Sequence, residues 1–194
     1  MFVARFVHYQ TITKIMTGHV SCARHNRRLC LCGDMKKDEK PMKIRPTMHD
    51  DIAALQEVLD RTALFPSEML PDMMRDFLSD TQSSDIWLTC EADGKAVGFC
   101  YAVPEELAEG VWNMRAIAVQ PTEQGGGCGS AIVAHLEAAL KERSQRILIA
   151  DTSGADAFEP TRAFYRKNGY IEEACIRDFW AEGDDKIVFW KSLR

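Results

Sequence analysis

The sequence predicts a mixed α/β fold of one domain, with a central sheet of about seven strands flanked by about four helices. The 194 residues and the hydrophobic content of 46% are enough for one buried core. Segments with strand-like and helix-like spacing alternate from Lys43 onward. Several predicted strands follow one another directly, which a doubly wound parallel sheet would not allow, so the sheet is expected to be mixed.

Each element follows from hydrophobic spacing and from the residues that interrupt it. Apolar residues recur at helical spacing after Asp50 or Asp51, either of which can cap a helix. The tetrapeptide ADGK at residues 92–95 separates two apolar runs and predicts a hairpin, and Gly169 ends a short helix. The expected elements are a strand at 43–47, helices at 49–62 and 67–80, a hairpin within 86–104, a strand at 111–119, a helix at 129–144, a strand at 146–152, a helix at 160–170, and strands at 171–180 and 186–193.

Charge divides the chain near residue 41. The first 45 residues contain ten Lys or Arg and three Asp or Glu, a net charge of +7. Because the whole chain has a formal net charge of −5, the remaining residues carry −12. We expect residues 1–41 to be a basic, flexible extension and residues 42–194 to form the folded domain. The extension has three competing explanations: a translation start upstream of a domain that begins at Met42, a targeting peptide, or a functional arm.

Composition also narrows the function classes. An acidic domain argues against nucleic acid as the main partner, and no apolar run approaches the roughly 20 residues that cross a bilayer. Seven scattered cysteines suggest buried thiols in a cytoplasmic protein rather than disulfides. The cluster of Cys22, His25, Cys30 and Cys32 has no usual zinc spacing, so no metal site is expected.

The strongest local signal is a glycine cluster between a strand and a helix, VQPTEQGGGCGS at residues 119–130. Glycine disfavours both elements, so its use here indicates a backbone that bends tightly or approaches a ligand. Main-chain N–H groups at the start of a helix can bind phosphate oxygens, and the helix dipole adds partial positive charge. The segment therefore predicts a pyrophosphate site.

Two common phosphate loops fit this cluster poorly. A P-loop needs a lysine before its Ser or Thr, whereas Cys128-Gly129-Ser130 contains none. A dinucleotide fingerprint opens a βαβ unit, whereas this cluster follows four predicted strands.

Two segments resemble the GCN5-related N-acetyltransferase (GNAT) superfamily. Residues 119–121 (VQP) and 124–129 (QGGGCG) are similar to the family's acyl-CoA loop, and residues 163–170 (AFYRKNGY) are similar to its Ala-x-x-Phe-Tyr-x-Lys-x-Gly-Phe segment. With the predicted helices and strands around them, they extend the resemblance over residues 43 to 193, in the family's element order. The resemblance implies the GNAT fold, with the sheet splayed between the fourth and fifth strands.

The resemblance also implies acetyl-CoA as cosubstrate, without a metal. The end of the strand before the loop would bind the pantetheine arm through its main chain, here at Ile117, Ala118 and Val119. Arg162 and Lys167 are expected either to reach the coenzyme A phosphates or to lie on a solvated helix face. The residues that the resemblance assigns to the pyrophosphate are Gln124, Gly125, Gly126, Gly127, Gly129 and Ser130.

Tyr165 matches the family tyrosine that protonates the leaving thiolate; the alternative is a core aromatic with a solvated hydroxyl. The position where several family members have a glutamate base is Asn113, which cannot accept a proton. Glu109 and Asp151 remain as candidate bases, with Asp151 preferred, and a water relay without a dedicated base stays open.

Two further positions depart from the family. Phe158 stands where the family usually has an asparagine, which puts a side-chain hydrogen bond to coenzyme A in doubt. Cys128 lies within the loop, where the family commonly has a small apolar residue, so we expect it to pack rather than react.

These features predict an acyltransferase (EC 2.3.1.-) that moves an acetyl group from acetyl-CoA to a primary amine by direct attack in a ternary complex. The alternative is a non-catalytic acyl-CoA-binding regulatory module. The acceptor is expected to be a small amine, an amino-acid-like molecule or a peptide N-terminus; the last is suggested by the turn AEGDD at 181–185, which resembles that of ribosomal-protein N-acetyltransferases.

We expect a cytoplasmic monomer or homodimer, with no nucleic-acid or membrane partner. The acceptor pocket is expected among Phe65, Met69, Met73, Met74 and Phe77, with Glu68, Asp72, Asp184 and Asp185 attracting a cationic amine.

Overall fold

The computed structural model describes residues 42–79 and 83–194. The expected extension at 1–41, including its Cys and His cluster, lies outside the described residues. Seven strands and four α-helices occur within them, in the predicted order. They are β1 (Met42–Pro46), α1 (Ile52–Thr62), α2 (Leu70–Ser79), β2 (Ile86–Ala92), β3 (Lys95–Pro104), β4 (Val111–Val119), α3 (Cys128–Glu142), β5 (Ile147–Ser153), α4 (Glu159–Lys167), β6 (Ile171–Ala181) and β7 (Asp184–Ser192).

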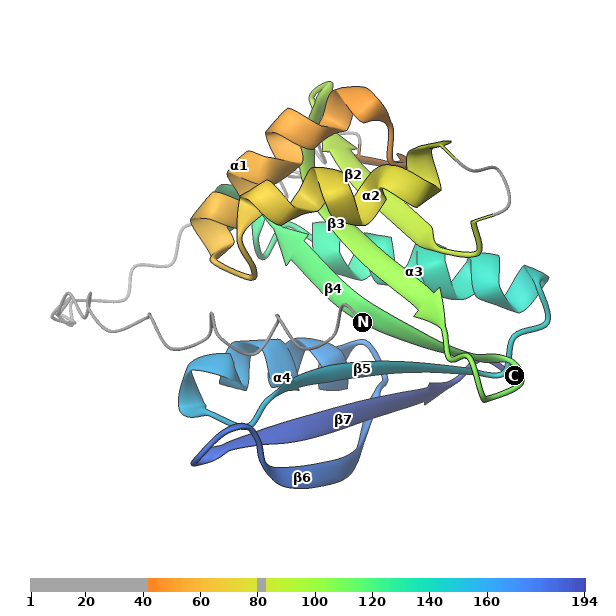
Figure 1. Ribbon diagram of the computed structural model, residues 1–194, viewed down its shortest axis with the longest axis vertical. Helices are drawn as coiled ribbons and strands as arrows, with labels where there is room; N and C mark the ends of the chain where they lie inside the picture. The colour runs from red at the N-terminus through yellow and green to blue at the C-terminus, as the bar shows by residue number, and fades with distance from the viewer. Residues whose placement is uncertain (1–41, 80–82) are drawn as a thin grey trace, which may run out of the picture.

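All seven strands belong to one mixed sheet in the order β1-β2-β3-β4-β5-β7-β6. Only β4 and β5 pair in parallel; the other neighbours are antiparallel. A parallel pair needs a crossover, which α3 provides between these two strands (Figure 1). The predicted mixed sheet is confirmed.

The parallel pair separates soon after it begins. β4 pairs with β5 only from Val111 to Asn113, opposite Ile147 to Ile149. The remaining six residues of β4, through Val119, pair on that side with no strand of the described residues, and β5 continues along β7 instead. The sheet is therefore splayed between its fourth and fifth strands, as the resemblance implied, and main-chain groups of β4 face the opening.

Helices cover the two faces of the sheet and create two hydrophobic cores. Helices α1 and α2 lie over β2, β3 and β4, whereas α3 and α4 lie on the opposite face (Figure 1). On the first face Leu55 and Leu59 of α1 pack with Trp87 and Phe99. On the second, α3 packs through the fully buried residues Ile132, Leu136 and Leu140. Burying one side chain of this size contributes about 1.5–3 kcal/mol to the stability of the fold. Packing of the helices on both faces therefore stabilises the splayed sheet.

A few boundaries differ from those the sequence predicted. Residues 67–69 form a 3-10 turn and α2 begins at Leu70, so Pro71 lies in the first turn, where its missing N–H costs nothing. Cys90, Cys100 and Cys128 are buried free thiols, as expected, but Cys175 is exposed on the edge strand β6. No helix of the described residues is both long and apolar enough to cross a bilayer.

Candidate active site

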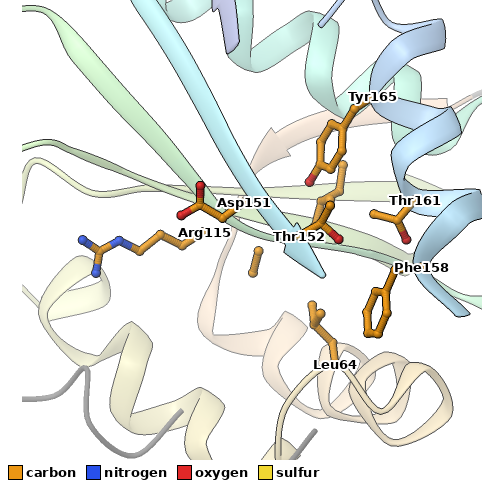
Figure 2. A pocket seen from close by; sticks show the side chains of 9 residues that line it. Leu64, Arg115, Asp151, Thr152, Phe158, Thr161 and Tyr165 are labelled. Atoms are coloured by element: carbon orange, nitrogen blue, oxygen red, sulfur yellow. The ribbon is translucent and has the colours of Figure 1, made fainter. Parts of the chain in front are cut away.

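A small cavity of about 90 Å³ lies where β4 and β5 separate (Figure 2). Strand residues form its sides, α4 and the turn before it form a wall, and the loop after α1 contributes Leu64. In Figure 2, Arg115 and Asp151 lie on one side and Phe158, Thr161 and Tyr165 on the other. The lining residues are Leu64, Arg115, Ala116, Ile117, Asp151, Thr152, Phe158, Thr161 and Tyr165.

Tyr165 extends from α4 into this cavity and is only 3% exposed. Its ring packs against Phe164, Tyr170 and Phe189, with centroids 5.0–5.6 Å away, so the direction of its hydroxyl is fixed. Burial, followed by the nearby Asp151 carboxylate, raises the pKa of Tyr165 above its usual value. The phenol therefore keeps its proton at neutral pH and can donate a hydrogen bond to a developing anion.

Asp151 lies near the end of β5 and also faces the cavity. Its Oδ2 is 2.5 Å from Nζ of Lys186 on β7, whereas its Oδ1 is buried and has no hydrogen-bond partner among the described residues. Lys186 is in turn held over the ring of Phe179, 4.7 Å from the centroid. Asp151 thus offers the cavity a carboxylate with one oxygen still available as an acceptor.

The two other positions considered for the base lie elsewhere. Glu109 is exposed before β4, at the end of that strand away from the cavity. Asn113 is 8% exposed, and its Nδ2 donates to Oε1 of Glu105 at 2.9 Å. Neither residue lines the cavity.

The glycine loop leaves a series of main-chain amides without acceptors at the start of α3. The first α-type bond of the helix runs from the Ala131 amide to the Gly127 carbonyl. Ahead of it, no backbone acceptor within the described ranges serves the amides of Gly125, Gly127, Cys128, Gly129 and Ser130. Free amides combined with the helix dipole suit an anion, so the loop has the donors that a pyrophosphate needs.

The loop glycines do not all serve the same purpose. Gly125 and Gly127 have φ of +78° and +93°, a conformation that disfavours side chains, and a Cβ there would meet nothing closer than 3.8 Å. A Cβ at Gly129 would instead lie 3.0 Å from Cε2 of Phe164, so Gly129 allows α3 and α4 to approach. Space beside Gly125 and Gly127 is thus left open, whereas the space at Gly129 is filled by packing.

Gln124 and Arg162 have partners within the protein. Nε2 of Gln124 donates to the Val119 carbonyl at 3.0 Å and braces the loop against the end of β4. The buried guanidinium of Arg162 donates to the carbonyls of Ser153 and Ala155, at 2.6 and 2.9 Å, and pairs with Glu159. Binding of coenzyme A phosphate by Arg162 stays a prediction, and it would require Arg162 to give up these bonds.

The expected acceptor residues lie outside the cavity. Phe65 and Met74 are buried in the core beneath α1 and α2. Asp184 accepts a hydrogen bond from Ser153, and Asp185 accepts one from the Asp178 amide at 3.0 Å. In their place the apolar lining comes from Leu64 and Phe158.

Arg115 is the charged lining residue that sequence reasoning missed. It sits at an irregularity in β4, since Ala102 pairs with Met114 but the preceding Tyr101 pairs with Ala116. One extra residue on one strand is a β-bulge, and bulges are frequent beside active sites. The run RAIAV carries no signal of a bulge, because only pairing with β3 reveals it.

Comparison with known proteins gives a consistent picture. Residues 83–172 match a family model described as an acetyltransferase (GNAT) domain. No curated protein sequence matches the chain significantly. Among solved structures, a Desulfovibrio desulfuricans protein assigned to the GNAT family has a TM-score of 0.74 at 24% identity, covering 79% of this chain and 100% of its own.

Two further structures extend the likeness. A ribosomal-protein-S18-alanine N-acetyltransferase from Escherichia coli has a TM-score of 0.64 at 19% identity, covering 79% of this chain and 94% of its own. An aminoglycoside 6'-N-acetyltransferase complexed with coenzyme A has a TM-score of 0.57 at 16% identity, covering 78% of this chain and 97% of its own. Likeness at these identities establishes the fold.

Proposed function

We propose that this chain, whose residues 83–172 match a GNAT acetyltransferase domain, is an N-acetyltransferase of that superfamily that moves an acetyl group from acetyl-CoA to a primary amine. The reaction joins the amine nitrogen to the acetyl carbon and breaks the carbon–sulfur bond, releasing coenzyme A as a thiol. One structural neighbour is complexed with coenzyme A, which supports that class of cosubstrate.

A single arrangement carries the proposal: free amides at the start of α3 adjoin the opening between β4 and β5, and Tyr165 lies inside that opening. An extended diphosphate ester could bind its anion at Gly125, Gly127 and the first residues of α3. Its arm would then follow the unpaired edge of β4 at Ile117, Ala118 and Val119. This path ends at the cavity, where the thioester would meet Tyr165.

We assign Tyr165 as the acid. Its buried phenol can donate to the sulfur as negative charge develops there, and it is fixed by three aromatic rings. The free Oδ1 of Asp151 is our preferred acceptor for the proton that the amine loses, directly or through water. Across the reaction Asp151 gains the proton that leaves nitrogen and Tyr165 loses the proton that reaches sulfur. Transfer of one proton from Asp151 to Tyr165, directly or through water, then restores both groups.

The second candidate is an acyl-CoA-binding regulatory module without turnover. Asn113 favours it, because an amide bonded to Glu105 occupies the strand position from which a base was expected. Tyr165 and Asp151 in one cavity favour the enzyme, and we keep the enzyme as the main proposal. Both acceptor types are supported by a structural neighbour: a peptide α-amine by the ribosomal-protein-S18-alanine N-acetyltransferase, and a small amine by the aminoglycoside 6'-N-acetyltransferase. Cytoplasmic location and a monomeric or dimeric state stay predictions.

Calorimetry and a thiol-release assay test this function. Titration with acetyl-CoA should show binding at one site per chain, and a panel of primary amines should include one that accelerates release of free thiol above hydrolysis. Acetyl-CoA binding without amine-dependent release across the panel would favour the regulatory module. No heat change at millimolar acetyl-CoA would contradict both readings.

A further inference from the structure

We propose that the acceptor of this site is an amino-acid-like zwitterion, a primary amine that also carries a carboxylate, and that Arg115 binds the carboxylate. This inference rests on the proposed acetyl transfer and names its substrate class. It arises from two charged groups with unused bonding capacity that share one small cavity.

The bulge in β4 gives Arg115 its place in the cavity. Met114 is buried in the core beneath α3, whereas Ala116 is buried in the core beneath α1 and α2. Residues two apart on a regular strand face the same side, so the strand reverses its alternation at Arg115. The extra residue is exposed and lines the cavity instead of entering either core.

The guanidinium of Arg115 lies near the Tyr101 phenol, which donates to Asp85, but it is bonded to neither residue. No hydrogen bond or ion pair joins it to a residue within 42–79 or 83–194. The other charged lining residue, Asp151, takes its cation from Lys186. Arg115 therefore brings to the edge of the cavity a cation that forms no ion pair with the described residues.

Asp151 supplies the complementary anion on the same side. Its Oδ1 is buried and accepts no hydrogen bond from residues 42–79 or 83–194, a state that is costly unless a ligand completes it. Figure 2 shows Arg115 and Asp151 on the side of the cavity opposite Phe158 and Thr161, with the Arg115 side chain extending outward from the cavity. A ligand amine near Asp151 would leave a neighbouring substituent beside Arg115.

A carboxylate is the substituent that this arrangement favours. Guanidinium matches it with two parallel hydrogen bonds, and charge-assisted bonds are stronger than neutral ones. A peptide N-terminus would place an uncharged amide there and leave the cation unpaired. The apolar residues Leu64 and Phe158 line the same cavity and suit the side chain of a small apolar amino acid.

Matched acceptors test the inference. We would measure kcat/KM for small apolar α-amino acids and for their α-carboxamides, which keep the side chain and mimic a peptide N-terminus. The wild-type protein should prefer each acid over its amide by about tenfold or more. In Arg115→Gln that preference should fall to about twofold or less, with acetyl-CoA affinity by calorimetry unchanged, and Arg115→Lys should keep part of it.

The control is Arg143→Gln, which removes an exposed guanidinium at the end of α3, outside the cavity. It should keep the full preference for acids. Equal use of acids and amides, a preference for amides, or an acid preference that survives in Arg115→Gln would overturn the inference while leaving acetyl transfer intact. Failure of every amine, acid or amide, would instead overturn the proposed function and this inference with it.

Discussion

At the scale of single residues, contact with the cavity distinguishes Tyr165 from its neighbouring tyrosine, Tyr170. Tyr170 packs against it at 5.6 Å and is also 3% exposed, but only Tyr165 lines the cavity. Burial raises the pKa of both phenols, so both stay protonated at neutral pH. Access to the thioester, rather than acidity, distinguishes their roles.

Tyr165→Phe should lower kcat about 100-fold, because it removes the proton donor and keeps the ring in its aromatic cluster. The KM for acetyl-CoA should change little. Steady-state thiol release measures both, with circular dichroism to verify the fold. Tyr170→Phe makes the same chemical change outside the cavity and should keep kcat within about threefold. Equal effects of the two substitutions would argue against an acid role for Tyr165.

At the scale of elements, the start of α3 combines two demands on glycine. Gly129 allows the helix to pack on Phe164, while Gly125 and Gly127 adopt positive φ and leave the adjacent amides open. Gly98 of β3 belongs to the same junction, since a Cβ there would lie 2.8 Å from the Ala118 carbonyl. The sequence pattern identified the loop but not this close approach of β3 and β4.

Gly127→Ala should weaken acetyl-CoA binding about tenfold, because the new side chain strains the loop at φ +93° and shifts its amides. Calorimetry gives the affinity. Gly94→Ala is a matched control, since Gly94 has φ +74° in the β2–β3 turn with nothing within 4 Å of its Cβ. Both variants should lose about 1 kcal/mol of stability, but only the first should lose affinity. An unchanged affinity for Gly127→Ala would remove that loop from the phosphate site.

At the scale of the whole molecule, a partly buried ion pair joins β1 to the start of α1. The guanidinium of Arg45 donates to Asp51 at 2.6 and 2.8 Å, and the Met48 amide donates to the same carboxylate at 2.8 Å. Burial by itself would raise the pKa of Asp51, but the hydrogen bonds from Arg45 and Met48 outweigh it and lower the pKa below its ordinary value. Folding therefore favours the ionised carboxylate.

This pair predicts how stability depends on pH. An Asp whose pKa is lower when folded stabilises the protein above its unfolded pKa of about 3.9, and this contribution is lost as pH falls through the folded value. Asp51→Asn should cost about 2 kcal/mol at pH 7 and show a shallower loss of stability below pH 4 than the wild type. Urea unfolding from pH 2 to 7 measures both. Parallel pH profiles for the two proteins would contradict the assignment.

The domain boundary is also a property of the whole molecule. We propose that residues 42–194 fold independently, and the D. desulfuricans structure, covered over 100% of its length, matches 79% of this chain. Limited proteolysis followed by mass spectrometry should yield a resistant fragment that begins within a few residues of Met42. That fragment should keep the Tm of the full chain within about 3 °C. Cleavage inside β2 to β4 at the same rate would contradict this boundary.

The sequence by itself determined the element order, the glycine loop and three cavity residues, Ile117, Asp151 and Tyr165. The element order and the loop follow from hydrophobic spacing and from glycine at a strand–helix junction, whereas the cavity residues follow from the resemblance to the GNAT superfamily. Tertiary structure alone decided the cavity's charge and shape. Arg115 enters it only because pairing with β3 creates a bulge, and Leu64 reaches it from a loop that lies far away in the chain. The internal bonds of Arg162 were equally hidden, because its carbonyl acceptors are positioned by the turn after β5. Such contacts join residues whose separation in sequence carries no period, so only the folded chain specifies them.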